Sequence, residues 1–257
     1  MELLLHQKRV LVTGSSRGIG LAIAKEFLAE GARVVLTSRH QSDLDRLHRN
    51  LSQAYIGSEL LALACDFTDS DSILGLKNKI VTSWSGLDIL VVNVGSGESV
   101  AEPLPPAAHF KRVVRVNFDS AVDTVREFFP LLQTTRGNIL FIASIAGLEA
   151  FGAPVDYAAA KSALIAFAKN LARKVGGMGV RVNCIAPGNI YFQGGSWAGK
   201  VKADPERVQT MLQMNVPLQR FGRPEEIAVA AVFLASERSS FTTGACLVID
   251  GGQTVGI

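Results

Sequence analysis

The chain has 257 residues, of which 48% are hydrophobic and only 19% are charged. This composition excludes a disordered, a collagen-like and a coiled-coil protein. The formal net charge of +3 is too small to indicate nucleic acid as the main partner. We interpret the basic cluster of His109, Lys111, Arg112 and Arg115 as a solvated helix face.

The three cysteines, Cys65, Cys184 and Cys246, lie far apart in the sequence. Their spacing fits neither a disulfide framework nor a zinc site, so we expect no metal. Each lies in an apolar stretch, which favours a buried, reduced thiol.

The first residues hold no apolar stretch long enough for a signal peptide, and no stretch approaches the roughly 18 apolar residues of a membrane span. We therefore expect a cytoplasmic protein that does not contact a membrane.

In chain order, short apolar runs alternate with longer helical patterns. The runs expected to form strands are residues 9–13, 34–37, 60–65, 87–92, 138–143, 180–185 and 246–249. The stretches expected to form helices are residues 19–30, 42–53, 69–84 and 107–132, a stretch from 157 onward, and 224–235. Most strand runs are apolar on both faces, which is typical of a parallel sheet covered by helices on both sides.

No linker, repeat or low-complexity segment divides the chain. We therefore predict an α/β fold: a single doubly wound domain, residues 1–257, with a seven-stranded parallel sheet and helices on both faces. The segment 188–217 is rich in glycine, glutamine and aromatic residues. We expect it to be a loop with short helical pieces that acts as a substrate lid.

A glycine-rich loop follows the first strand, with Gly14, Gly18 and Gly20 spaced as G-x-x-x-G-x-G. Gly14 allows a tight turn, Gly18 lets the backbone approach a ligand, and Gly20 allows close packing of helix and strand. The helix that follows points free N–H groups at a pyrophosphate. Taken alone, the loop is weak evidence, because a simple turn has the same pattern.

The same residues also match G-x-S-x-G, the nucleophile elbow of α/β-hydrolases, with Ser16 as the nucleophile. A hydrolase triad needs a histidine late in the chain. The second half of the chain has none, because the four histidines are His6, His40, His48 and His109. The hydrolase is therefore a remote alternative.

The second strand ends at Ser38, 24 residues after Gly14, where an acidic residue would bind the ribose 2′-hydroxyl of NAD. No acidic residue is present, and Arg39 follows directly, while Arg17 lies inside the glycine-rich loop. Guanidinium groups suit a 2′-phosphate. We therefore expect NADP(H) to be preferred over NAD(H), with the alternative that Arg39 only begins a solvated helix.

Tyr157 is the one tyrosine with a lysine four residues later, so Tyr157 and Lys161 share a helix face. Ser144 lies 13 residues before Tyr157, and Asn117 lies 27 residues before Ser144. A Y-x-x-x-K match alone is common by chance. Combined with the glycine-rich loop near the N-terminus, it becomes a specific signal.

With these motifs the chain resembles the short-chain dehydrogenases/reductases, of the type that includes the 3-oxoacyl-[acyl-carrier-protein] reductases. The resemblance covers about residues 8–252 and implies a Rossmann-like fold. It implies the catalytic residues Asn117, Ser144, Tyr157 and Lys161. The cofactor-binding residues that it implies are Gly14, Ser16, Arg17, Gly18, Ile19, Gly20, Ser38, Arg39, Asp66, Phe67, Asn93, Val94, Gly95, Tyr157, Lys161, Pro187, Gly188 and Ile190.

The resemblance implies an NADPH-dependent oxidoreductase that moves a hydride between nicotinamide and a carbonyl or secondary alcohol. Tyr157 would be the general acid/base, Ser144 would hold the substrate oxygen, Lys161 would lower the pKa of Tyr157, and Asn117 would hold a relay water. Phe192 departs from the family pattern, which has a threonine that binds the carboxamide at this position.

The substrate is less well defined. A small carbonyl or alcohol is expected, and one alternative is a 3-oxoacyl group on acyl carrier protein, as in fatty-acid or polyketide synthesis. A non-catalytic dinucleotide-binding protein is a remote alternative.

The helix from Tyr157 has small residues and only Lys161 as a charge up to Ala168. Such a helix suits subunit packing, so we expect a homotetramer or homodimer.

Overall fold

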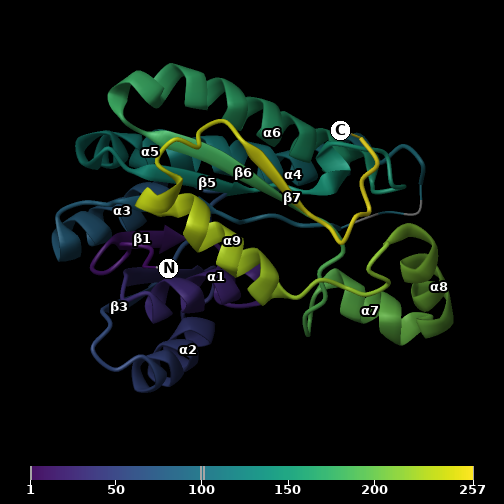
Figure 1. Ribbon diagram of the computed structural model, residues 1–257, viewed down its shortest axis with the longest axis horizontal. Coiled ribbons are helices and arrows are strands. Elements are labelled where there is room, and N and C mark those ends of the chain that lie inside the picture. The colour runs from purple at the N-terminus through teal and green to yellow at the C-terminus, as the bar shows by residue number, and fades with distance from the viewer. Residues whose placement is uncertain (1, 99, 101, 257) are drawn as a thin grey trace.

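The computed structural model describes residues 2–98, 100 and 102–256. A seven-stranded sheet forms the centre of the molecule (Figure 1), with the strand order β3-β2-β1-β4-β5-β6-β7, and every neighbouring pair is parallel. The strands are β1 (Arg9–Val12), β2 (Arg33–Ser38), β3 (Leu60–Ala64), β4 (Ile89–Val92), β5 (Asn138–Ile142), β6 (Arg181–Pro187) and β7 (Cys246–Ile249). The predicted doubly wound, Rossmann-like domain is confirmed.

Helices cover both faces of the sheet (Figure 1). On one face, α1 (Gly18–Ala29), α2 (Gln41–Ala54) and α9 (Pro224–Ala235) enclose one hydrophobic core. On the other face, α3 (Ser70–Trp84), α5 (Ser120–Thr135) and α6 (Val155–Val175) enclose a second core. Central strands such as β4 and β5 are buried on both sides, which explains their continuous apolar sequence. Within the described residues, no helix is both long and apolar enough to span a bilayer.

The long helix expected at residues 107–132 is interrupted. It consists of α4 (Ala107–Val114), a π-helical turn (Arg115–Asp119) and α5 (Ser120–Thr135). A π turn adds one residue to the helical repeat and is often found at functional sites. Asn117 lies within this turn. The apolar periodicity of the sequence does not show a one-residue insertion, because the residues on both sides keep a helical spacing.

The interpretation of the basic cluster as a solvated helix face is confirmed for Lys111 and Arg112, which are exposed, and is wrong for His109 and Arg115. His109 is buried, and its Nδ1 lies 2.8 Å from Asp156 Oδ2. Arg115 is half-buried and hydrogen-bonds to Asp123 and to the carbonyl of Thr68. Asp156 and Thr68 each lie 47 residues from the side chain that they bind, so the sequence alone gave no sign of these two contacts. Of the cysteines, Cys65 and Cys184 are buried as expected, whereas Cys246 is half-buried.

The segment expected to form a lid projects beside the main body (Figure 1). It contains α7 (Ser196–Ala203) and α8 (Pro205–Asn215). Val208, Leu212 and Val216 form a small core of its own, with Trp197 and Phe221 packed against it. The rings of Trp197 and Phe221 lie 5.2 Å apart, so these lid aromatics pack on each other.

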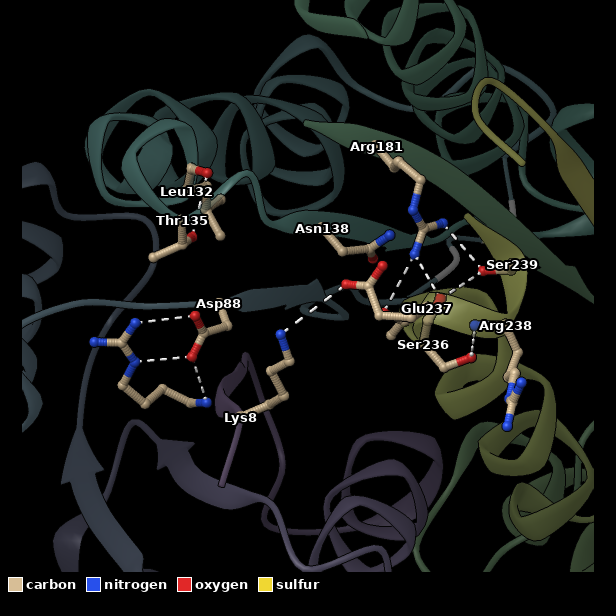
Figure 2. Close-up of polar contacts among 12 residues, drawn as sticks. Lys8, Asp88, Leu132, Thr135, Asn138, Arg181, Ser236, Glu237, Arg238 and Ser239 are labelled. Carbon is tan, nitrogen blue, oxygen red and sulfur yellow. Dashed lines mark hydrogen bonds and ion pairs between the residues drawn. The ribbon is translucent and has the colours of Figure 1, made fainter. Parts of the chain in front are cut away.

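Arg181 is the first residue of β6 and makes the main polar link at the edge of the sheet where the strands begin (Figure 2). Its guanidinium group donates five hydrogen bonds to the last residues of α9 and to the segment that follows. The acceptors are the carbonyls of Leu234, Ala235, Ser236 and Thr242 and the hydroxyl of Ser239. This link ties the end of α9 to the start of β6.

We expect Arg181→Lys to lower the free energy of unfolding by about 2 kcal/mol, because one ammonium cannot reproduce the planar fork of donors and leaves buried carbonyls unpaired. Urea unfolding followed by circular dichroism measures the change. Arg136→Lys is the control, because Arg136 lines the same edge and its side chain makes no hydrogen bond with the residues that the structure describes. An unchanged midpoint for Arg181→Lys would contradict the assignment.

Candidate active site

The glycine-rich loop joins β1 to α1 at the carboxyl edge of the sheet, where open parallel sheets bind ligands. Gly14 and Gly18 have φ angles of +62° and +58°, which favour glycine. A Cβ on Gly20 would lie 2.5 Å from Asn93 Nδ2, so α1 approaches the loop as closely as predicted. The N-terminus of α1 has no side-chain cap. Its N–H groups are therefore oriented to bind an anion such as a pyrophosphate.

Two threonines that sequence reasoning did not single out hold this loop. Thr37 Oγ1 accepts a hydrogen bond of 2.9 Å from Gly14 N. Thr13 Oγ1 accepts hydrogen bonds from the backbone N–H groups of Asn93 and Val94, at 2.8 and 3.1 Å. Asn93 Nδ2 donates to the carbonyls of Thr13 and Gly14. Threonine is common in strands, so its presence there carried no functional signal.

The end of β2 carries the residues expected to select the cofactor. Ser38 is half-buried and Arg39 is exposed beside it. In the neighbouring loop, the N–H and hydroxyl of Thr68 donate to Asp66 Oδ1 at 2.9 and 2.7 Å. These bonds lower the pKa of the Asp66 carboxyl, and Arg39 adds a smaller electrostatic contribution. Asp69, not Asp66, caps α3, so Asp66 is free of that structural role.

Ser144 and Tyr157 come together at the carboxyl end of β5. Ser144 Oγ accepts a hydrogen bond of 3.1 Å from Ala146 N, which fixes the short turn after the strand. A Cβ on Gly147 would lie 2.6 Å from the carbonyl carbon of Lys161, so this turn packs directly on α6. Tyr157 lies in the first turn of α6, where the Ser144 hydroxyl is near enough to the phenol to lower its pKa.

Lys161 lies one turn after Tyr157. Its Nζ donates a hydrogen bond of 3.1 Å to Ile142 O and lies 5.8 Å from the centre of the Tyr157 ring. Burial lowers the pKa of the Lys161 ammonium to about 8. Burial raises the pKa of the Tyr157 phenol, and the nearby Ser144 hydroxyl opposes that rise. The sequence-based expectation was that Lys161 would lower the pKa of Tyr157. In this structure the larger effect on Tyr157 is burial, and it acts in the opposite direction.

Asn117 is fully buried in the π turn, and its side chain is bound to backbone groups. Its Nδ2 donates to the carbonyls of Ser96 and Val113, and its Oδ1 accepts from Ser96 N. A Cβ on Gly95 would lie 2.8 Å from Asn117 Oδ1 and 3.1 Å from Lys161 Nζ. The structure therefore brings Asn117 and Lys161 to the same place, on either side of Gly95.

The remaining predicted residues surround this site less directly. Gly188 packs closely on Asp250, and its N donates to Ile249 O at 3.0 Å. Ile190 is buried and forms an isolated bridge with Gly222. The side chain of Phe67 is part of a hydrophobic core, so it supports the fold. The others are Ser16 and Ile19, both half-buried on or after the glycine-rich loop, and Pro187, buried at the end of β6.

Phe192 brings the lid into contact with the glycine-rich loop. A Cβ on Gly18 would lie 2.6–2.9 Å from three atoms of the Phe192 ring, and a Cβ on Gly195 would lie 2.9–3.1 Å from the same atoms. The ring therefore lies between two glycines. Arg17 Nη1 adds a hydrogen bond of 3.2 Å to Gly194 O. At the position where the family pattern has threonine, this chain has an aromatic ring that packs on the loop.

Known proteins share this arrangement over nearly the whole chain. A family model described as "Enoyl-(Acyl carrier protein) reductase" matches residues 14–254. The chain is 37% identical to L-fucose dehydrogenase of Oryctolagus cuniculus, over 97% of this chain and 86% of that protein. It is 34% identical to the 3-oxoacyl-[acyl-carrier-protein] reductase FabG of Chlamydia muridarum, over 98% of this chain and 100% of that protein. The chain belongs to the short-chain dehydrogenase/reductase family.

Solved structures of other short-chain dehydrogenases/reductases superpose closely. L-sorbose reductase from Gluconobacter frateurii, solved with NADPH and L-sorbose, has a TM-score of 0.90 at 31% identity and covers 100% of both chains. A 7α-hydroxysteroid dehydrogenase, solved with NADH and a 7-oxo bile acid, has a TM-score of 0.89 at 29% identity and covers 99% of this chain and 98% of that chain. As a member of the short-chain dehydrogenase/reductase family, this chain is an oxidoreductase of the class that binds a nicotinamide dinucleotide.

Proposed function

We propose that the protein is an NADPH-dependent carbonyl reductase that also runs in reverse as a secondary-alcohol dehydrogenase. The observation that carries this proposal is the meeting of Ser144, Tyr157 and Lys161 at the end of β5, with Lys161 Nζ 5.8 Å from the centre of the Tyr157 ring. An acid, a hydroxyl that binds the substrate oxygen and a buried cation then meet at the carboxyl edge of the sheet. This edge also carries the glycine-rich loop, which fits a dinucleotide.

Each of the four side chains has its own role in the proposed reduction. Ser144 holds the substrate oxygen, and Tyr157 donates its phenolic proton to that oxygen during reduction. Lys161 stabilises the tyrosinate that remains, because a nearby cation favours the anion. Asn117, beside Lys161, binds the water through which the proton is replaced. Bound NADPH supplies the hydride for the carbonyl carbon.

The end of β2 supports NADP(H) over NAD(H). No acidic side chain is present at Ser38 to bind two ribose hydroxyls or to repel a phosphate, and Arg39 is exposed beside it. The structure solved with NADPH and that solved with NADH show that related proteins use either cofactor. The preference proposed here therefore depends on these side chains.

We expect kcat/KM for NADPH to exceed that for NADH, and Arg39→Ala to reduce this ratio about tenfold by removing one exposed, charge-assisted hydrogen bond to the 2′-phosphate. Steady-state kinetics with both cofactors measures the ratio. Arg49→Ala, an exposed arginine near the end of α2, changes the net charge equally and serves as the control. A wild-type ratio below one would contradict the preference.

Two substrate classes have support. Relatives acting on sugars, L-fucose dehydrogenase and L-sorbose reductase, favour a sugar or polyol. The FabG relative favours a 3-oxoacyl thioester carried on acyl carrier protein. The experiment is a carbonyl panel with L-sorbose, a simple ketone and an acetoacetyl thioester, followed by loss of NADPH absorbance. Turnover of no member, with NADPH bound, would favour the non-catalytic alternative.

We also propose that the chain assembles as a homodimer or homotetramer. Several large apolar side chains are exposed on helices and on the segment before β7, among them Val155, Val229, Phe233 and Phe241. Exposed apolar groups of this kind are typical of subunit interfaces. Light scattering at micromolar concentration tests the assembly, and a monomer would contradict it.

A further inference from the structure

His109 and Asp156 form a buried polar contact that the proposed chemistry does not use. His109 Nδ1 lies 2.8 Å from Asp156 Oδ2, and the two side chains are 9% and 0% exposed. The contact joins α4 to the second residue of α6, directly before Tyr157. Burying a carboxylate is costly unless it is paired and hydrogen-bonded. The buried carboxylate of Asp156 therefore needs the contact with His109.

Asp156 also binds the backbone of its neighbour Tyr157. Asp156 Oδ1 accepts a hydrogen bond of 2.8 Å from Tyr157 N. The residue before α6 is Pro154, which gives the helix no side-chain cap, and Asp156 is the acidic residue of the first turn. An acidic group there stabilises the free N–H groups of a helix start. One carboxylate therefore holds the first turn of α6 with one oxygen and α4 with the other.

The α4 side of the contact leads to Asn117. His109, Val113 and Asn117 are buried and follow one another at intervals of four residues, so they lie along one side of the helix. Asn117 Nδ2 donates a hydrogen bond of 3.0 Å to Val113 O. The helical segment that carries Asn117 is thus fixed, through His109, to the helix that carries Tyr157 and Lys161.

We infer that His109 and Asp156 are positioning residues that hold the phenol of Tyr157 between Ser144 and Lys161. The inference rests on the proposed function, because it assigns the pair a part in the reaction of Tyr157. Without the contact, the first turn of α6 is free to move away from α4. A proton donor that loses its distance and angle to the acceptor loses rate even when the substrate still binds.

Three variants test the inference. H109L/D156L replaces both polar groups by apolar ones, so that no buried charge is left without its partner. His109→Gln keeps a side-chain N–H that reaches toward Asp156. Ile80→Ala is the matched control for stability, because Ile80 is fully buried and its truncation leaves a cavity beside α3, which carries none of the proposed catalytic residues.

We expect kcat of H109L/D156L to fall at least tenfold, while its Kd for NADPH, measured by nicotinamide fluorescence, stays within twofold of the wild-type value. His109→Gln and Ile80→Ala are expected to keep kcat within threefold. A folded double variant with wild-type kcat overturns the inference. So does a double variant whose kcat and NADPH affinity fall together, because that pattern indicates general damage.

A spectroscopic readout separates this inference from the proposed function. The chain has three tyrosines, and the ionisation of Tyr157 is obtained by subtracting the absorbance of the matching Tyr157→Phe background. Because the nearby Ser144 hydroxyl lowers the pKa of Tyr157, movement of the phenol away from Ser144 shifts that pKa upward in H109L/D156L and not in His109→Gln. If the wild type reduces no carbonyl yet the shift occurs, the proposed function fails and the positioning role stands. Carbonyl reduction by the wild type, with no shift in the double variant, overturns the positioning role alone.

Discussion

Tyr157→Phe is expected to lower kcat for NADPH-linked carbonyl reduction by about 10²–10⁴-fold, the contribution typical of a positioned general acid. Phenylalanine keeps the ring that packs beside Lys161 but has no proton to donate to the substrate oxygen. The variant keeps the Ser144 hydroxyl that binds the substrate oxygen and changes no residue of the glycine-rich loop. The loss should therefore appear in kcat and only weakly in the affinity for NADPH.

The measurement is the initial rate of NADPH oxidation with a carbonyl that the wild type reduces. Tyr191→Phe, which removes the hydroxyl of a lid tyrosine and keeps its ring packed near Phe221, is the matched control. Circular dichroism and the Kd for NADPH establish that each variant is folded and binds the cofactor. Undiminished turnover by folded Tyr157→Phe would exclude the proposed role of this phenol.

The architecture could be predicted from the sequence because its signals are local. Strand β7 and helix α9 begin and end at the residues expected, 246–249 and 224–235. The strands of the sheet centre are apolar on both faces, which identifies a covered parallel sheet. The π turn around Asn117 was missed because it depends on one inserted residue. The buried state of His109 was missed because it depends on Asp156, which is 47 residues away in the chain.

In the candidate site, too, local spacing could be predicted from the sequence and long-range contacts could not. The spacing of Ser144, Tyr157 and Lys161 predicted residues that the structure does bring together. Thr13 and Thr37, which hold the glycine-rich loop, had no signal, because a hydroxyl at a strand end becomes informative only when its partner is known. The contact between Phe192 and Gly18 could not be predicted either, because it joins segments that lie far apart in the chain. Sequence spacing thus identifies reactive groups, and the structure identifies what holds them.

The buried ammonium of Lys161 is expected to make stability depend on pH. Burial lowers its pKa from 10.5 to about 8 in the folded protein, whereas the unfolded chain keeps the ordinary value. Between these two pH values, the unfolded state binds a proton that the folded state does not, so stability rises with pH. Below about pH 8 both states are protonated, and the full cost of burying the charge is present. That cost is about 3 kcal/mol, at roughly 1.4 kcal/mol for each pH unit of the shift.

The comparison of the wild type with Lys161→Met measures this effect, because methionine fills a similar volume without a charge. The difference in the free energy of unfolding, from urea titrations at steps between pH 7 and pH 10.5, should favour Lys161→Met most at pH 7 and shrink as pH rises. Lys169→Met is the matched control, because Lys169 is exposed on the same helix. A constant difference across this range would mean that Lys161 keeps an ordinary pKa, and its charge would then be balanced by a group other than the Ile142 carbonyl.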